Sequence, residues 1–128
     1  MREVLSDERK NALVQHLGYY GPLLTETQRE MTQLYVDEDL SLSEIASRYA
    51  VTRQSVCDTI RKAGKIMDQY EEKLCLMSRS QEIMSIIRKA ITAADRIECA
   101  SEQAETEKTV VLEALRQLLI KEETDYGV

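Results

Sequence analysis

Apolar residues recur at intervals of three and four along most of the chain, which is the period of an amphipathic α-helix. A first helix is predicted over about residues 6–19, and Gly21 and Pro22 follow its end. A second helix is predicted to start at Thr25, because Thr25 and Gln28 have the spacing of a capping box. The pattern therefore opens with two short helices joined by a turn.

A third helix and a fourth follow with very little chain between them. Ser41 and Glu44 have the spacing of another capping box, so the third helix should begin there. It is expected to break at residues 50–52, where Thr52 can cap the fourth helix. A break of about three residues forces a sharp crossing, so this segment predicts a helix-turn-helix. The break contains no glycine, which sets it apart from many such turns.

The fourth helix has no stop signal until about Ser78. Its apolar seam has spacings of four and three and consists of Val56, Ile60, Ala63, Met67, Tyr70, Leu74 and Met77. Two further helices, over about residues 80–100 and 105–122, are expected to fold against it, joined near residues 100–107. The sequence thus predicts an all-α fold with a nucleic-acid-binding part in residues 1–66. Residues 67–128 form a helical extension and a candidate dimerisation region.

The composition supports an all-α fold and argues against an enzyme or a metal-binding protein. The 128 residues are 43% hydrophobic and 31% charged, with four glycines and one proline, so a helical core can form. His16 is the single histidine, the three cysteines are widely spaced, and no metal-ligand cluster, phosphate loop or nucleophile motif is present. We therefore expect a non-enzyme without cofactors. The cysteine pattern fits a reducing cytoplasm, and no apolar run is long enough for a membrane span.

Positive charge gathers on the fourth helix although the net charge of the chain is −6. Residues 41–79 hold 7 basic and 5 acidic side chains, and the segments on either side are acidic. If Val56 and Ile60 face the core, the opposite side of this helix faces outward. The candidate nucleic-acid-binding residues on or beside that side are Thr52, Arg53, Gln54, Ser55, Asp58, Arg61, Lys62 and Lys65.

These residue types suit nucleic acid. The short polar groups and Gln54 can reach base edges near the helix start, and the lysines and arginines can hold backbone phosphates. The same residues also fit a simpler interpretation, in which Asp58 pairs with Arg61 and Lys62 on an ordinary solvated surface. The carboxylate of Asp58 would also repel phosphate. The C-terminal apolar seam also has two interpretations, since it can close the core of one chain or form the interface of a homodimer.

Residues 19–74 resemble the YlxM family of small bacterial helix-turn-helix proteins. The segments that carry the resemblance are "YGPLLT", "DLSLSEIA", "VTRQSV" and "YEEKL". The same region is similar, more loosely, to region 4 of bacterial sigma factors, whose second helix binds promoter DNA. In this chain that helix corresponds to Arg53–Lys65. The resemblance implies a regulator that takes part in the signal recognition particle pathway.

Two functions are therefore expected from different classes. The first is a regulator that binds duplex DNA through residues 52–65. The second is an accessory protein that contacts the RNA or the GTPase of the signal recognition particle without binding DNA. An adaptor that uses only the C-terminal helices is a third possibility.

Overall fold

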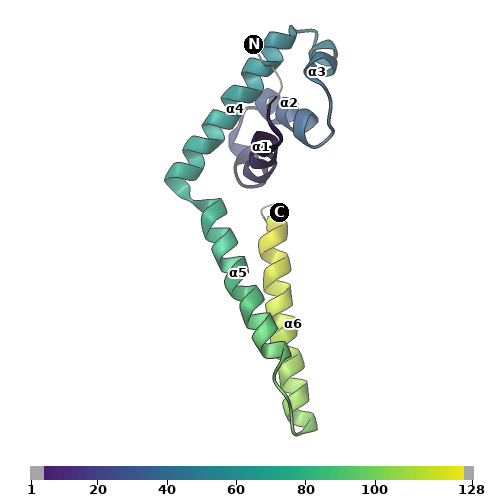
Figure 1. The fold of residues 1–128 in the computed structure, drawn as a ribbon, viewed down its shortest axis with the longest axis vertical. Helices are drawn as coiled ribbons and strands as arrows, with labels where there is room; N and C mark the ends of the chain where they lie inside the picture. Colours follow the sequence, from purple (N-terminus) through teal and green to yellow (C-terminus); the bar gives the residue numbers. More distant parts are fainter. Residues whose placement is uncertain (1–4, 126–128) are drawn as a thin grey trace. The chain divides into compact units, whose positions relative to one another are not determined.

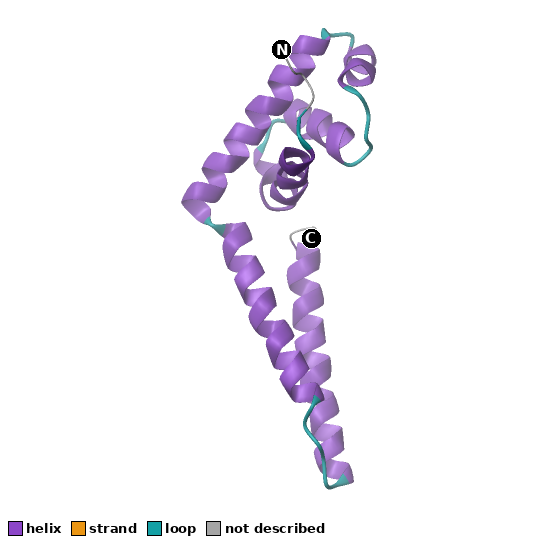
Figure 2. Cartoon of the chain, in the orientation of Figure 1, coloured by secondary structure: helices purple, strands orange, loops and turns teal. Residues whose placement is uncertain are grey.

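The computed structural model describes residues 5–125, and within them all regular secondary structure is helical (Figures 1 and 2). The elements in chain order are α1 (Asp7–Tyr20), the 3-10 helix η1 (Gly21–Leu23), α2 (Glu26–Val36), α3 (Leu42–Tyr49), α4 (Arg53–Leu74), α5 (Leu76–Asp95) and α6 (Glu102–Asp125). The prediction of an all-α fold is confirmed. The chain divides into two compact units, Met1–Met77 and Ser78–Val128.

In the first unit, the predicted helix starts are confirmed, because short polar side chains cap them. Ser6 accepts a hydrogen bond from the backbone of Arg9 at the start of α1. Thr25 and Ser41 each form the reciprocal pair of hydrogen bonds of a capping box, at the starts of α2 and α3. Each cap satisfies backbone donors that a helix start otherwise leaves without partners.

In the first unit, α1, α2 and α3 pack on one side of α4 (Figure 1). The core contains the apolar and aromatic side chains that are least exposed, all at 3% or below: Leu13, Tyr20, Met31, Tyr35, Leu42, Ile45, Val56, Cys57, Ile60, Ala63 and Met67. Apart from Cys57, the α4 members of this core come from the predicted seam, and burying them leaves the opposite side of α4 in solvent. α4 is thus the central helix of the unit and also has an exposed polar side.

Gly64 permits a close approach between α1 and α4. A Cβ atom at this position would lie 2.9 Å from Leu13 Cδ2 and 2.6 Å from the Arg9 guanidinium. Arg9 in turn pairs with Asp68 of α4 at 3.0 Å. A glycine at this position therefore makes room for α1.

The predicted fourth helix, with no stop signal until about Ser78, is too long. α4 ends at Leu74, because Cys75 adopts a left-handed backbone conformation with φ 54° and ψ 31°. The far half of α4 packs against α1, where the rings of Tyr20 and Tyr70 stack at 5.9 Å. Met67 is fully buried in this arrangement, so the first compact unit continues past the boundary after Ile66 that the sequence suggested.

Tyr20 holds the junction between α4 and α5. Its buried hydroxyl donates to Glu71 Oε1 and accepts from the backbone N–H of Leu76. The same carboxylate oxygen accepts from the N–H of Met77 at 2.9 Å. One side chain of α1 therefore fixes the first backbone groups of α5, which lack partners within their own helix.

We expect Tyr20→Phe to lower the free energy of unfolding at neutral pH by about 1–3 kcal/mol, because buried hydrogen-bonding groups lose their partner. Burial, with the hydrogen bond to Glu71, raises the pKa of Tyr20 from 10.0 to about 12. The stabilisation by the neutral hydroxyl is therefore complete below about pH 10 and is lost as the pH rises toward 12. Urea unfolding of both proteins at pH 7 and pH 11 measures this. A stability difference that does not shrink at high pH contradicts the assignment.

The second unit consists of α5 and α6 side by side (Figure 2). Arg88 pairs with Glu123 at 3.1 Å, and Lys108 donates to the carbonyl oxygens of Asp95 and Ile97. Arg88 contacts Glu123 near the end of α6, whereas Asp95, later in α5, contacts Lys108 near the start of α6, so the two helices are antiparallel. The buried side chains of this unit are few: Ser80, Met84, Ile87, Ala94 and Leu112.

The predicted boundaries in this unit need correction. α5 ends at Asp95 and not near residue 100, and α6 begins at Glu102, inside the predicted connection. Ser101 explains the early start, because its side chain caps the backbone N–H of Ala104. α6 also continues to Asp125, beyond the predicted end near residue 122, and residues 126–128 lie outside the described part of the chain.

Candidate nucleic-acid interface

The corner between α3 and α4 is made without glycine. Ala50 takes the left-handed conformation with φ 54° and ψ 44°, and its N–H reaches the carbonyl oxygens of Ala46 and Ser47. The N–H of Val51 also bonds to Ala46, at 3.0 Å. These are the bonds of a Schellman-type helix end, which usually employs glycine. The prediction of a tight turn near Val51 is therefore confirmed, and alanine adopts the conformation that glycine usually supplies.

α3 is held against α2 on the other side of this corner. Tyr49 donates a hydrogen bond to Glu30 Oε2 of α2 at 2.8 Å. This hydrogen bond, together with partial burial, raises the pKa of the Tyr49 hydroxyl above its ordinary value. Because Ile45 of α3 is also fully buried, the helix before the turn is anchored by both packing and a polar contact.

Thr52 starts α4 and belongs to the candidate surface itself. Its side chain accepts from the N–H of Ser55 at 3.0 Å, which confirms the predicted cap. Behind it, Val56, Cys57 and Ile60 are buried at 2% exposure or less. The inward side of α4 is thus fixed, and its outward side follows from the helical period.

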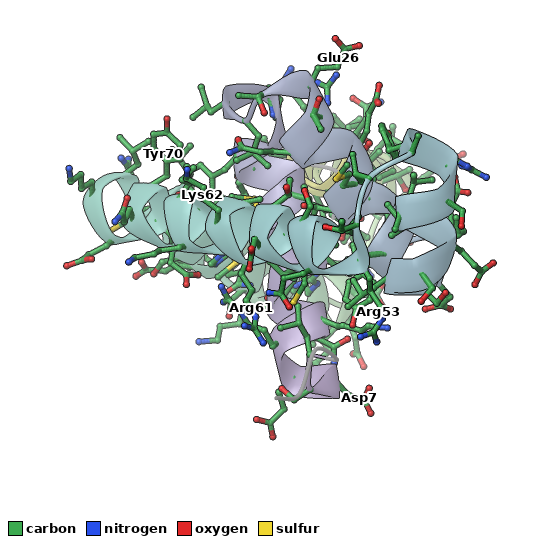
Figure 3. The ribbon with its side chains drawn as sticks, turned by 90° about the horizontal axis from the view of Figure 1, so that it is seen from above. Asp7, Glu26, Arg53, Arg61, Lys62 and Tyr70 are labelled. Atoms are coloured by element: carbon green, nitrogen blue, oxygen red, sulfur yellow. The ribbon has the colours of Figure 1, made fainter. Side chains whose placement is uncertain are left out.

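All eight candidate residues are exposed: Thr52, Arg53, Gln54, Ser55, Asp58, Arg61, Lys62 and Lys65. Figure 3 shows Arg53 and Arg61 projecting from one side of α4 and Lys62 from the other. The surface therefore has cations along both of its edges. It holds four cations and one carboxylate, in a chain whose overall charge is −6.

Part of this surface is hollowed. A shallow depression of about 390 Å³ is lined by Thr52, Gln54, Ser55, Asp58, Thr59 and Lys62. Gln54 Nε2 donates to Asp58 Oδ1 across one helical turn at 2.9 Å. This contact occupies one amide proton and leaves the Gln54 carbonyl oxygen and its second proton for another partner. The structure thus brings five of the eight candidates together, and Arg53, Arg61 and Lys65 lie outside the depression.

Thr59 also lines the depression but was not among the predicted residues. Its hydroxyl donates to the carbonyl oxygen of Ser55 at 2.9 Å, within its own helix. The spacing of four residues from Ser55 and three from Lys62 could have indicated its position. Its hydrogen is committed to the backbone, so only the hydroxyl oxygen is left to accept from a ligand.

The single histidine, metal binding and membrane spanning were also considered in the sequence. His16 is buried, with its Nδ1 atom 3.3 Å from Asp68 Oδ1, so it does have a carboxylate neighbour, which sequence spacing had not suggested. Within residues 5–125, no group of three or more histidine, cysteine, aspartate or glutamate side chains could hold a metal ion. None of the described helices is both long and apolar enough to span a bilayer.

A short helix, a tight corner and an exposed following helix define a helix-turn-helix protein. Residues 7–116 match the family described as "Putative helix-turn-helix protein, YlxM / p13 like", and the chain belongs to this family. That description is of a helix-turn-helix family and not of an enzyme family.

Individual relatives support this membership. The UPF0122 protein YlxM of Bacillus subtilis is 35% identical over 114 residues, which cover 89% of this chain and 99% of that protein. A UPF0122 protein of Desulforamulus reducens is 54% identical over 70 residues, covering 54% of this chain and 60% of that protein. One from Limosilactobacillus fermentum is 46% identical over 74 residues, covering 58% of this chain and 63% of that protein.

Proposed function

We propose that this protein is a regulator that binds nucleic acid through the outward side of α4. The observation that carries the proposal is the exposure of every candidate residue on a helix that directly follows a rigid corner. Cations at the edges of α4 suit the phosphates on either side of a groove, and the depression offers amide and hydroxyl groups to base edges. A cytoplasmic location follows from this role.

One observation favours a second candidate. Asp58 lies in the middle of the polar surface, where its carboxylate opposes phosphate, and the chain as a whole is acidic. Both features suit a protein that contacts duplex DNA weakly. The second candidate is an accessory of the signal recognition particle pathway that contacts the RNA or the GTPase of that particle, as the family resemblance implies.

Binding measured at several salt concentrations separates the two candidates. The purified chain is titrated into a labelled DNA duplex and into labelled signal recognition particle RNA between about 50 and 200 mM salt. The proposal predicts binding to the duplex that weakens linearly on a log–log plot, because each neutralised phosphate releases counterions. Binding to the RNA alone favours the second candidate, and binding to neither nucleic acid contradicts the proposal.

We also propose that the second unit forms a homodimer. Ile83 directly precedes buried Met84 on α5, and Val111 directly precedes buried Leu112 on α6. On each helix the buried residue faces the other helix, and the residue before it is rotated about 100° away from that direction, in the same sense on both helices. Because the helices are antiparallel, both rotations point to the same side of the helix pair. Leu118, seven residues after Val111, extends this apolar side.

The same apolar side of a second copy of the chain can pack against this side and bury it. Ile83, Val111 and Leu118 are 42%, 50% and 48% exposed, and a pair of helices buries too little apolar surface to be stable on its own. Two copies packed together would form a four-helix arrangement. Such a dimer would also carry two α4 helices, as two-fold readers of DNA do.

Leu118→Glu should convert the dimer to a monomer, because it places an unpaired carboxylate in the apolar interface. Ile120→Glu is the matched control, since Ile120 is 61% exposed but lies two residues away, on a different side of α6. Light scattering after size-exclusion chromatography gives the mass of each. A monomeric wild type, or equal behaviour of the two variants, contradicts this interface.

A further inference from the structure

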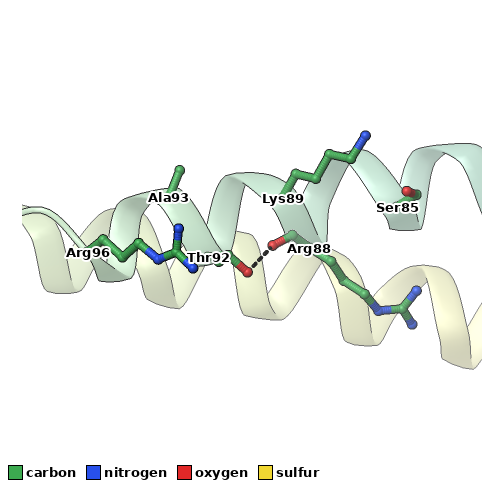
Figure 4. A pocket seen from close by; sticks show the side chains of 6 residues that line it. All are labelled: Ser85, Arg88, Lys89, Thr92, Ala93 and Arg96. Atoms are coloured by element: carbon green, nitrogen blue, oxygen red, sulfur yellow. Dashed lines mark hydrogen bonds between the residues drawn. The ribbon is translucent and has the colours of Figure 1, made fainter.

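A second basic surface lies on α5, in the unit that does not contain the helix-turn-helix. Figure 4 shows the side chains of Ser85, Arg88, Lys89, Thr92, Ala93 and Arg96, which line an open depression of about 400 Å³. We call this surface the α5 stripe. Its positions are separated by three, one, three, one and three residues, which keeps them along one side of the helix.

The α5 stripe differs in charge from its surroundings. Residues 80–128 hold 6 basic and 10 acidic side chains, and half of those basic residues belong to the stripe. None of the six residues that line it is acidic. A cluster of cations on an otherwise acidic unit produces a local positive potential that attracts anions.

Two of the three cations are available to a ligand. Among the described side chains of residues 5–124, no ion pair involves Lys89 or Arg96. Arg88 pairs with Glu123 of α6 at 3.1 Å, but both side chains are substantially exposed, and exposed ion pairs stabilise little. The pair directs the Arg88 guanidinium toward α6, and Lys89 extends to the other side (Figure 4).

The hydroxyl groups of the stripe have different capacities. Thr92 donates its hydrogen to the carbonyl oxygen of Arg88 at 3.0 Å, so it cannot also donate to an anion. Ser85, one turn before Lys89, can donate. From Lys89 to Arg96 the helix rises by about 10 Å, since each residue adds about 1.5 Å. That length matches roughly three nucleotides of one strand, at about 3.4 Å of axis each.

The chemistry of the stripe suits a polyanion better than a protein surface. Strong protein interfaces depend on buried aromatic or aliphatic anchors, and the one apolar side chain in the stripe is Ala93. The apolar side chains Ile83 and Val111 belong to the proposed dimer face on another side of the unit. Phosphate binding needs only cations and hydrogen-bond donors at accessible positions.

We propose that the α5 stripe is a second phosphate-contact site, at which Lys89, Arg96 and Arg88 bind the backbone of a nucleic acid. This inference deepens the proposed function, since it adds a sequence-independent contact to the one assigned to α4. It does not depend on how the two units are arranged, because every residue of the stripe belongs to the second unit.

The test is a comparison of matched double variants of the full-length chain. Lys89→Gln with Arg96→Gln removes the two cations of the stripe that have no ion pair. Arg79→Gln with Arg116→Gln removes the same charge from exposed positions of the second unit outside the stripe. Binding to a labelled DNA duplex and a labelled RNA hairpin is measured across the salt series. Light scattering shows whether each variant keeps its oligomeric state.

We expect the stripe variant to bind about tenfold more weakly at low salt, with a salt slope smaller by about 2, because two phosphate contacts are lost. The control variant should bind like the wild type. Equal weakening in both variants indicates a general charge effect and overturns the stripe. No weakening in the stripe variant overturns it as well, and so does a change in its oligomeric state that accounts for the loss.

A third variant, Arg61→Ala with Lys65→Ala on α4, separates this inference from the proposed function. Loss of binding in the α4 variant alone supports the nucleic-acid surface on α4 and overturns the proposed site on the α5 stripe. Loss in the stripe variant alone supports the stripe and overturns the assignment to α4. If the wild type binds neither nucleic acid, both are overturned.

Discussion

Replacing Arg61 and Lys65 together by alanine is expected to weaken nucleic-acid binding about ten- to a hundredfold at low salt. Both side chains are exposed on α4, one helical turn apart. Each is expected to neutralise one phosphate, so the slope of log affinity against log salt should fall by about 2. The fold should be unaffected, because neither residue belongs to the core. Fluorescence anisotropy across the salt series measures both quantities.

The control for this prediction is Lys73→Ala with Arg79→Ala. These cations are also exposed, but they lie beyond the candidate surface of residues 52–65. The control should retain the affinity and the salt slope of the wild type. A variant at Arg61 and Lys65 that binds as tightly as this control shows that α4 does not contact phosphate. Circular dichroism of both proteins excludes unfolding as the cause of any loss.

Replacing Gly64 by valine is expected to destabilise the first unit by about 3 kcal/mol, at the upper end of the cost of overpacking a core. The new Cβ would lie 2.9 Å from Leu13 Cδ2, and Leu13 is 1% exposed and cannot move into solvent. It would also displace the Arg9 guanidinium from Asp68. Gly64→Ala should cost less, because the gain in helix propensity of about 1 kcal/mol offsets part of the clash.

A double-mutant cycle identifies the clash as the cause. Leu13→Ala alone creates a cavity and should destabilise the protein by about 2–5 kcal/mol. Combined with Gly64→Val, it should destabilise by less than the sum of the two single changes, because the valine fills the space that leucine leaves. Urea unfolding gives the three values. Strict additivity, or a Gly64→Val variant as stable as the wild type, contradicts the proposed close approach.

The helix starts of the first unit could be predicted from the sequence because their signals are local. Ser6, Thr25, Ser41 and Thr52 each cap a helix through a residue only three positions away. Helix ends could not be predicted equally well. Cys75 ends α4 in a left-handed conformation that its residue type does not signal. A corner made by Ala50 is similarly invisible in residue type, although the spacing of the flanking helices revealed its position.

Contacts between distant positions explain most of what the sequence did not reveal. Tyr20 bonds to Glu71, and His16 lies beside Asp68, across more than 50 residues in each case. A single sequence has no signal that joins such positions. The contact of the far half of α4 with α1 could therefore not be predicted. The candidate surface was easier to predict, because the buried side chains Val56 and Ile60 fix the helix orientation and leave the other side exposed.

The central claim is that the outward side of α4 contacts nucleic acid. The most direct test is to follow the backbone amide signals of the full-length chain by nuclear magnetic resonance while a DNA duplex or an RNA hairpin is added. We predict that the largest shift changes fall on residues 52–65. If the nucleic acid binds and the shift changes fall elsewhere in the chain, with residues 52–65 unaffected, the claim is contradicted.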